Sequence, residues 1–186
     1  MQILPYILLF VGVFLRLIPH PLNVAPVAAI ALFAGVYLRK SWAVILPLSI
    51  MMMSDILMSV PAFREALPWG LHGAGWYSLA PITWLSFAFV GLIGLWVRQK
   101  KNVLSIAGGT LLGSIVFYLV TNWAVWFFGT MYAHTFSGLI QSYTMALPFF
   151  RNTLIGDLFY TTVLFGGFES VRWFVRMKAR REVPQS

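Results

Sequence analysis

Three charged side chains lie inside apolar stretches of the sequence, and chemistry is expected from these residues first. Arg16 falls near the end of the first apolar run, Asp55 late in the third and Asp157 early in the last. A charge at such depth is costly unless a partner or a ligand compensates it, so each residue marks a candidate site. The three could form an internal ion-pair network that holds helices together, or they could pair with polar groups of a bound solute.

The segment that follows Arg16 is rich in proline and carries hydrogen-bonding side chains. Three prolines within residues 19–26 lack an N–H donor and fix φ, which suits a rigid, non-helical wall of a cavity. His20 and Asn23 in the same segment would supply hydrogen bonds to a solute. This loop is therefore predicted to form one wall of a solute site.

Further candidates for substrate binding lie in the second half of the chain. Hydrogen bonds to a solute are expected from Asn122, Gln141 and Asn152, and apolar contact from Trp126 and Tyr143. The same asparagine and aromatic side chains could instead belong to a packed core. The sequence alone leaves both interpretations open.

Catalytic and metal-binding patterns are missing from the sequence. It contains no nucleophile elbow, no His-Glu-x-x-His pair, no phosphate-binding loop and no closely spaced carboxylates. The spacing of its three histidines matches no compact metal motif. The absence of cysteine excludes disulfides, thiolate metal sites, iron–sulfur clusters and cysteine nucleophiles. We therefore expect no enzymatic activity, no metal and no cofactor.

The composition is that of an integral membrane protein. Hydrophobic residues make up 60% of the 186 residues and charged residues only 10%, with a mean hydropathy of +0.82. A soluble domain usually has about 25% charged residues. The apolar runs are too long and continuous for outer-membrane strands, which alternate with period two. The first run lacks the basic start and small-residue cleavage site of a signal peptide, so we expect it to be a membrane helix.

The apolar runs predict an all-α domain of six transmembrane helices over residues 1–177, followed by a short polar tail at 178–186. Since a span needs about 20 apolar residues, the predicted helices lie at about 3–19, 24–38, 42–60, 79–97, 103–129 and 152–176. Residues 130–151 mix polar and apolar side chains and are expected to fold back over the membrane mouth. Two small-residue pairs, Ala31/Gly35 and Gly109/Gly113, mark either close helix contacts or chance spacings.

The distribution of basic residues predicts the orientation of these helices. Ten of the thirteen Lys and Arg residues lie in three clusters after the second, fourth and sixth predicted spans, at 39–40, 98–101 and 172–181. The positive-inside rule then places both termini in the cytoplasm. This orientation sends Arg16, Asp55, Asn122 and Asp157 toward the same outer surface. The net charge of +8 therefore reflects topology and anionic lipid headgroups rather than nucleic-acid binding.

Three motifs are carried by these regions of the chain. The first is Arg-x-x-Pro-His-Pro-x-Asn-x-x-Pro at 16–26, the second is Ser54-Asp55, and the third combines Thr121-Asn122-x-x-Val125-Trp126 with Gly156-Asp157. Together they resemble a family of small bacterial membrane proteins described as S-component-like. S components are the substrate-binding subunits of energy-coupling-factor (ECF) transporters.

This resemblance implies a six-helix bundle in the bacterial inner membrane with cytoplasmic termini. It implies a vitamin-sized site near the outer surface, closed by the first, third and fifth loops. It also implies docking on an ECF energising module, which consists of a coupling subunit and ATPases, through a small-xxx-small pair in the first helix. This chain departs from that pattern, because its first helix offers only Gly12. A solitary carrier therefore remains open.

The sequence leaves competing functions open. The first is a membrane transport protein that binds a small micronutrient from the extracytoplasmic side, as an S component or a solitary carrier. The alternative is an accessory or scaffold subunit of a larger membrane complex, whose polar residues would form a dry ion-pair core. A membrane enzyme is the weakest hypothesis, because it would require a bound metal.

Overall fold

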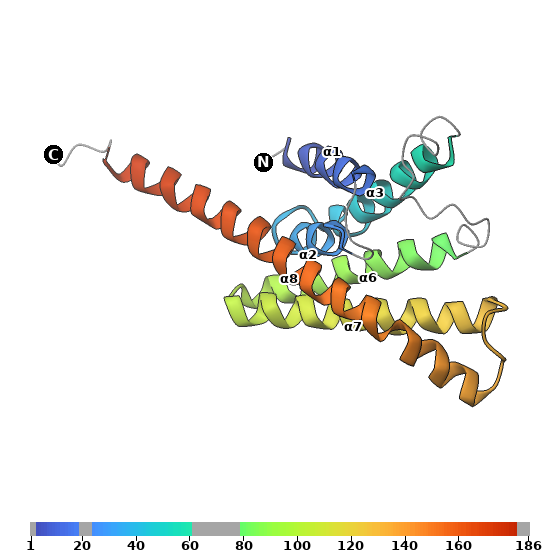
Figure 1. Cartoon of the computed structure of the whole chain (residues 1–186). Coiled ribbons are helices and arrows are strands. Elements are labelled where there is room, and N and C mark those ends of the chain that lie inside the picture. Colours follow the sequence, from blue (N-terminus) through green and yellow to red (C-terminus); the bar gives the residue numbers. More distant parts are fainter. Residues whose placement is uncertain (1–2, 19–23, 61–78, 182–186) are drawn as a thin grey trace.

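The structure is a computed structural model that describes residues 3–18, 24–60 and 79–181 (Figure 1). Within these ranges all regular elements are helical, so the predicted all-α class is confirmed. The helices are α1 (Leu4–Leu17), α2 (Val27–Tyr37), α3 (Trp42–Ser59), α6 (Ala80–Val97), α7 (Val103–Phe128) and α8 (Phe136–Arg181), with a 3-10 turn, η1 (Arg98–Lys100), after α6.

The short helix α2 forms the centre of the bundle. It packs against α3, α6, α7 and α8, and every residue from Val27 to Val36 is buried. A helix that is apolar on all sides is stable only where other elements surround it. Its Phe33, Ile30 and Leu32 are among the largest fully buried side chains. With 11 residues it is roughly 16 Å long, so it does not by itself cover a hydrocarbon core of about 30 Å.

Small residues bring the helices into close contact. A Cβ atom added to Gly35 in α2 or to Gly94 in α6 would overlap backbone atoms of the opposite helix. Gly109 and Gly113 of α7 face valine side chains of α6, and Ala31 is fully buried in α2. Both small-residue pairs predicted from the sequence therefore lie at helix contacts, as expected for tightly packed membrane helices.

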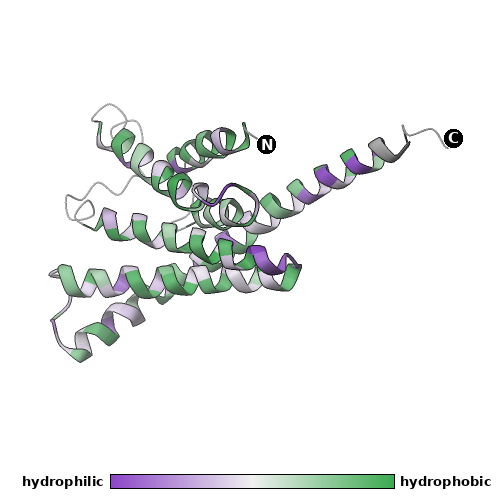
Figure 2. Ribbon diagram, turned by 180° about the vertical axis from the view of Figure 1, so that it is seen from behind, coloured by the Kyte–Doolittle hydropathy of each residue, from purple (hydrophilic) through white to green (hydrophobic). Residues whose placement is uncertain are grey.

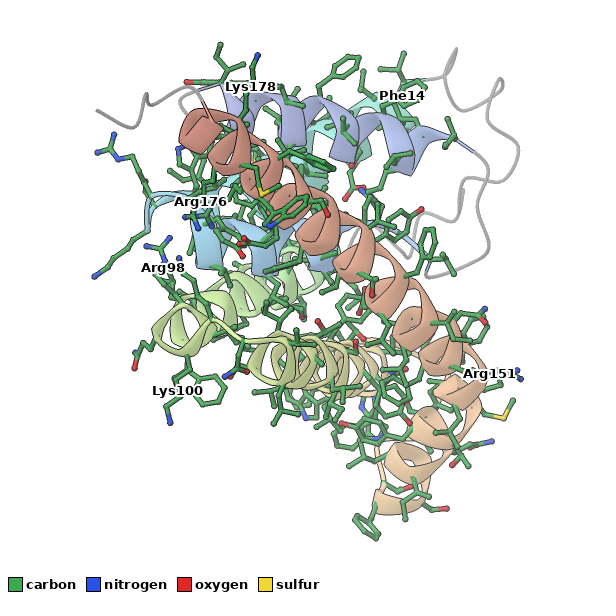
Figure 3. All side chains as sticks on the ribbon, turned by 90° about the vertical axis from the view of Figure 1, so that its left-hand side faces the viewer. Phe14, Arg98, Lys100, Arg151, Arg176 and Lys178 are labelled. Atoms are coloured by element: carbon green, nitrogen blue, oxygen red, sulfur yellow. The ribbon has the colours of Figure 1, made fainter. Side chains whose placement is uncertain are left out.

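Polar side chains terminate the helices at the end of the bundle where the basic residues lie. Asn102 caps the start of α7, since its Oδ1 accepts a hydrogen bond from the Ser105 N–H at 2.8 Å. The Arg98 guanidinium caps the end of α2 by donating from Nε to the Val36 carbonyl at 3.0 Å and from Nη2 to the Leu38 carbonyl. Arg98, Lys100, Arg176 and Lys178 lie on one side of the view in Figure 3, and Arg151 lies on the other.

Three helices of the described residues are long and apolar enough to cross a membrane, namely α3, α6 with η1, and α7. The apolar helices α1 and α2 are shorter. Large hydrophobic side chains are exposed on the outside, such as Phe10 at 72% and Phe159 at 59%. In Figure 2 hydrophilic residues gather at the α6–α7 connection and along the C-terminal part of α8. These features indicate a membrane protein.

The last helix is much longer than the sequence predicts. We expected a connection over 130–151 and a helix from 152, but α8 begins at Phe136 and continues for 46 residues. Thr135 Oγ1 accepts a hydrogen bond from the Gly138 N–H at 3.2 Å at its start, and Pro148 is accommodated inside the helix. At roughly 70 Å, α8 is more than twice as long as the hydrocarbon core is thick. Its C-terminal part projects away from the other helices in Figure 1.

The direction of the helices brings three of the predicted site residues toward one end of the bundle, whereas Asp157, expected at the same surface, lies near the middle of α8. In Figure 1 the C-terminal ends of α1, α3 and α7 lie at the same end as the starts of α6 and α8. The α6–α7 connection, with its basic residues, lies at the opposite end. Arg16, Asp55 and Asn122 occupy the last third of α1, α3 and α7 respectively, so the elements place them toward the end away from the basic clusters.

Candidate functional site

Arg16 and Asp55 form an ion pair between α1 and α3. Arg16 Nη1 lies 2.7 Å from Asp55 Oδ1, and the same nitrogen donates to the Ser54 hydroxyl. The second carboxylate oxygen, Asp55 Oδ2, accepts a hydrogen bond from Trp84 Nε1 of α6 at 2.7 Å. We refer to Arg16, Ser54, Asp55 and Trp84 as the Arg16 cluster. It ties three helices together at one end of the bundle.

The Arg16 cluster is enclosed but not sealed. The side chains of Arg16 and Asp55 retain 19% and 16% of their accessible surface. Ser54 is fully buried, and its hydroxyl lies 2.6 Å from the Ile50 carbonyl oxygen, which anchors it to its own helix. The planar guanidinium has five N–H donors, and Nη1 makes both contacts found here. The cluster can therefore pair internally and still offer donors to an additional polar group.

A second set of polar residues follows the contact between α7 and α8. On α7 these residues recur at every fourth position, so successive members lie one above the other along a ridge that winds gradually around the helix. We define the α7–α8 seam as Thr110, Ser114, Tyr118, Asn122 and Trp126 of α7 with Ser142, Tyr143, Asp157 and Thr161 of α8. The seam contains four of the predicted binding residues: Asn122, Trp126, Tyr143 and Asp157.

The half of the seam nearer the basic end is buried and consists of a carboxyl group and hydroxyls. Asp157 is 4% exposed, and its Oδ2 lies 2.7 Å from Ser114 Oγ. One turn closer to the basic end of the bundle, the hydroxyl oxygens of Thr110 and Thr161 lie 3.2 Å apart. Such hydroxyl contacts commonly join membrane helices, whereas a buried carboxyl group is unusual there and marks a functional candidate.

The other half of the seam is held together by hydrogen bonds between side chains and backbone carbonyls. The Tyr118 hydroxyl donates to the Tyr143 carbonyl at 2.7 Å, and the Tyr143 hydroxyl donates to the Leu119 carbonyl at 3.0 Å. The Ser142 hydroxyl donates to the Asn122 carbonyl at 3.0 Å. The Asn122 side chain donates from Nδ2 to the Tyr118 carbonyl of its own helix, and among the described residues no donor contacts its Oδ1. This amide oxygen is therefore the seam's clearest group for a ligand.

The remaining predicted residues are less closely associated. Trp126 Nε1 donates to the Ala133 carbonyl at 2.9 Å, so it fastens the α7–α8 connection. Gln141 is exposed on α8, and Asn152 is half-buried on the same helix. His20 and Asn23 lie outside the described residues.

One backbone contact links the Arg16 side of the bundle to the seam. Val24 lies just before the start of α2. A Cβ added to Gly156 of α8 would lie 3.1 Å from Val24, so the backbones approach closely there. The chain just before α2 therefore packs beside the residue that precedes Asp157.

A family model described as "Family of unknown function (DUF6580)" matches residues 1–180 of the chain. The chain belongs to the DUF6580 family. No curated protein and no solved structure matches it. The match covers both the Arg16 cluster and the seam, so all the polar contacts described above lie within the DUF6580 region.

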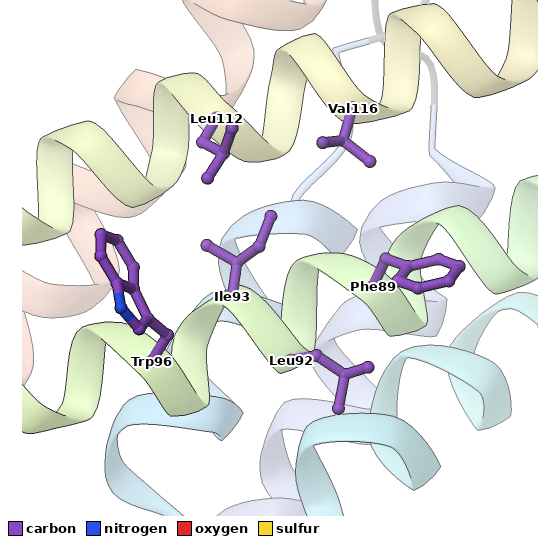
Figure 4. Close-up of a pocket in the computed structure, with 6 residues that line it drawn as sticks. All are labelled: Phe89, Leu92, Ile93, Trp96, Leu112 and Val116. Carbon is purple, nitrogen blue, oxygen red and sulfur yellow. The ribbon is translucent and has the colours of Figure 1, made fainter.

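The described part of this DUF6580 protein also has an apolar groove on the outside of α6 and α7 (Figure 4). Its volume is about 350 Å³, and its lining consists of Phe89, Leu92, Ile93, Trp96, Leu112 and Val116. These side chains lack the several convergent polar groups that orient a polar solute in a binding site. The groove suits a lipid chain better than the micronutrient predicted from the sequence.

Two residues that matter for the site were missed in the sequence, Trp84 and Ser114. Trp84 is one of eight tryptophans, and a tryptophan in a membrane protein commonly lies at an interface, so its residue type gives no signal of a site. Ser114 has the more visible signal, because Thr110 and Ser114 are four residues apart, as are Asp157 and Thr161. When two helices of one DUF6580 chain each carry a polar pair at this spacing, the two pairs can be expected to contact each other. In the described ranges no three metal-ligating side chains lie together.

Proposed function

We propose that this protein is a membrane carrier subunit that binds a small, ring-containing micronutrient or precursor from the extracytoplasmic side of the bacterial inner membrane. The observation that carries the proposal is the Arg16 cluster. Its charged side chains come from separate helices of an apolar chain and remain partly accessible. A charge maintained at this depth, toward the end away from the basic residues, is most readily explained by a polar ligand.

The proposed site lies between the Arg16 cluster and the half of the α7–α8 seam that contains Asn122 and Tyr143. Arg16 would pair with an acidic or carbonyl group of the solute, and the Asn122 amide oxygen would accept a hydrogen bond. Tyr143 would provide aromatic contact. The approach of Val24 to Gly156 supports this location, because it brings the residues just before α2 against α8 beside Asp157. The orientation, with both termini in the cytoplasm, is part of the proposal.

The packing of Gly12 favours a solitary carrier over a standard S component. A Cβ added to this glycine would lie 2.6 Å from Ile50 Cδ1 and 3.1 Å from Ile30 Cδ1. Gly12 therefore faces α2 and α3 inside the bundle and does not contribute to an outer docking surface. An ECF energising module remains the partner implied by the motifs, and it would have to bind elsewhere on the protein.

One observation favours the scaffold alternative. Among the described residues no buried side-chain nitrogen or oxygen lacks a hydrogen-bond partner. A polar network that is complete without a ligand can serve to hold helices in a unique arrangement. In that case the Arg16 cluster and the seam would be purely structural, and the protein would function through a protein partner.

Native mass spectrometry of the protein purified from its host separates these functions. The carrier hypothesis predicts a retained small molecule on the wild-type protein, which is lost in Asp55→Ala and in Asn122→Ala while both variants stay folded. Lys100→Ala is the matched control, since this exposed side chain lies at the opposite end and should retain the molecule. Retention in both site variants would refute the proposed site, and a stable protein complex without a small molecule would support the scaffold.

A further inference from the structure

Asp157 is a carboxyl group inside the bundle, and among the described residues its side chain contacts a hydroxyl rather than a cation. It is 4% exposed, and its Oδ2 lies 2.7 Å from Ser114 Oγ. Neither ion pair among the described residues, Arg16–Asp55 or Arg172–Glu169, includes it. An ionised carboxylate in such surroundings is costly, whereas a protonated one with a hydrogen-bond partner is readily accommodated.

The contacts of Ser114 provide a separate argument from proton counting. Ser114 Oγ also lies 3.1 Å from the Thr110 carbonyl oxygen. A hydroxyl group has one proton, so it donates to one of these two oxygens at a time. If Asp157 is protonated, both contacts become hydrogen bonds, because Asp157 donates to Ser114 and Ser114 donates to Thr110. If Asp157 is ionised, the Ser114 proton turns toward the carboxylate and the contact with Thr110 is lost.

We propose that Asp157 is a reversible proton-binding site, and that proton exchange at this residue accompanies the conformational change of the carrier. In uptake, a hydronium ion transfers its proton to a carboxylate oxygen of Asp157, which leaves a water molecule and a neutral carboxyl group. Release reverses this step. The role in transport rests on the proposed function, whereas proton binding itself does not require a solute.

Within the described residues, the elements that pack against Asp157 place no other charge beside it. The helices in contact with α8 are α7 and α2. Besides Asp157, the ionisable residues among the described side chains of these three helices are as follows: Tyr118 on α7, Tyr37 on α2, and Tyr143, Arg151, Tyr160, Glu169, Arg172, Arg176 and Lys178 on α8. Tyr118 donates to a backbone carbonyl, and Tyr37 is hydrogen-bonded to Glu169 three turns from Asp157. Ser114 is therefore the group that responds directly to the Asp157 proton.

A change of charge at Asp157 can reach the proposed solute site through two contacts. The α7–α8 seam contains Asp157 and Asn122, so a shift of the two helices at Ser114 alters the position of the amide. Gly156, the preceding residue, packs against Val24 at the entry to α2. Because an ionised carboxylate favours water, loss of the proton is expected to loosen this contact and open the bundle.

Infrared spectroscopy of the full chain in lipid tests this proposal, with the proton itself as the ligand. The sequence has only five acidic side chains, so a single protonated carboxyl band can be assigned by substitution. We expect a carboxyl C=O band in the wild type that disappears reversibly as pH is raised. Asp157→Asn should remove this band, whereas Glu169→Gln, which changes an exposed carboxylate on the same helix, should leave it unchanged.

A second variant keeps the test informative if Asp157→Asn does not fold. Ser114→Ala removes the hydrogen-bond partner and should shift the frequency of the band without abolishing it. A wild-type spectrum without a titrating carboxyl band, or a band that persists unchanged in Asp157→Asn, would overturn the proposal. A carboxyl band whose intensity changes with sodium concentration at constant pH would also overturn the proposal, because Asp157 would then bind a metal cation. The solute experiment with Asp55→Ala is independent, so failure of one proposal is distinguishable from failure of the other.

Discussion

Gly91 of α6 packs directly against the carbonyl group of Ala43 in α3, and a Cβ atom on this glycine would overlap the carbonyl oxygen. The carbonyl is available for this contact because of Pro47, four residues later in α3. Proline has no N–H, so the Ala43 carbonyl lacks its usual intrahelical donor and is pushed outward. Gly91 leaves room for this carbonyl, because it has no side chain at the point of contact. A proline and a glycine in different helices thus form one packing unit.

The first prediction follows from this contact. Gly91→Ala should lower the free energy of unfolding by about 3 kcal/mol or more, because backbone atoms of α3 cannot move aside as a flexible side chain would. Gly108→Ala is the matched control, since a Cβ at this α7 position meets no atom within 4 Å. It should stabilise the helix by about 0.5–1 kcal/mol. Reversible unfolding in mixed detergent micelles measures both, and equal stability of the two variants would contradict the close approach.

The second prediction concerns the ion pair of the Arg16 cluster. Arg16→Met leaves the Asp55 carboxylate without its cation and should cost about 3 kcal/mol of unfolding free energy, at the lower end of the range for a broken buried pair. Adding Asp55→Asn removes the remaining charge and retains an acceptor for Trp84, so the double variant should recover most of this loss. The measurement is a double-mutant cycle in the same detergent system.

The exposed pair Arg172–Glu169 provides the reference for this cycle. Its side chains keep 38% and 49% of their accessible surface, and exposed pairs contribute only about 0.5 kcal/mol. The coupling energy between Arg16 and Asp55 should therefore be several times larger. Equal coupling in the two cycles would mean that the Arg16 cluster is fully hydrated.

Most of the helices could be predicted from hydropathy, and α8 could not. The predicted spans at 42–60, 79–97 and 103–129 agree with α3, α6 and α7 within one residue, because polar or proline-containing segments interrupt the apolar sequence at their ends. The first part of α8 mixes polar and apolar side chains, so a connection was predicted there. Tertiary contacts decide this region instead, since Ser142 and Tyr143 are hydrogen-bonded to α7 and hold the helix against it.

The buried charged residues could be singled out from the sequence, but their partners could not. Charge in an apolar run identified Arg16, Asp55 and Asp157, because the cost of burying an ion does not depend on the fold. Their partners depend on which helix faces overlap, and this is set by packing around α2. Asp55 is paired with Arg16, whereas Asp157 contacts Ser114 on a different helix pair. A single pocket that contains all three residues is therefore not formed by the described side chains alone.

The third prediction concerns the end of the central helix. Arg98→Gln removes the charged donor to the Val36 and Leu38 carbonyls and should cost about 1.5–3 kcal/mol, as for other hydrogen bonds to charged groups. Hydrogen exchange should show faster exchange of the Leu38 amide, which donates to the Ala34 carbonyl at 3.0 Å. Lys100→Gln removes a neighbouring exposed charge and should leave that amide unchanged. Equal exchange in both variants would show that α2 terminates without help from Arg98.

The fourth prediction tests the orientation on which the carrier proposal depends. The chain has no cysteine, so single cysteines can be introduced without background labelling. Met131, between α7 and α8, is 73% exposed, and Lys100 is exposed between α6 and α7 at the opposite end of the bundle. If basic residues face the cytoplasm, a membrane-impermeant maleimide should label Met131→Cys in intact cells and should label Lys100→Cys only after the membrane is permeabilised. The reverse pattern would place the Arg16 cluster near the cytoplasmic surface, where it could not receive a solute from outside.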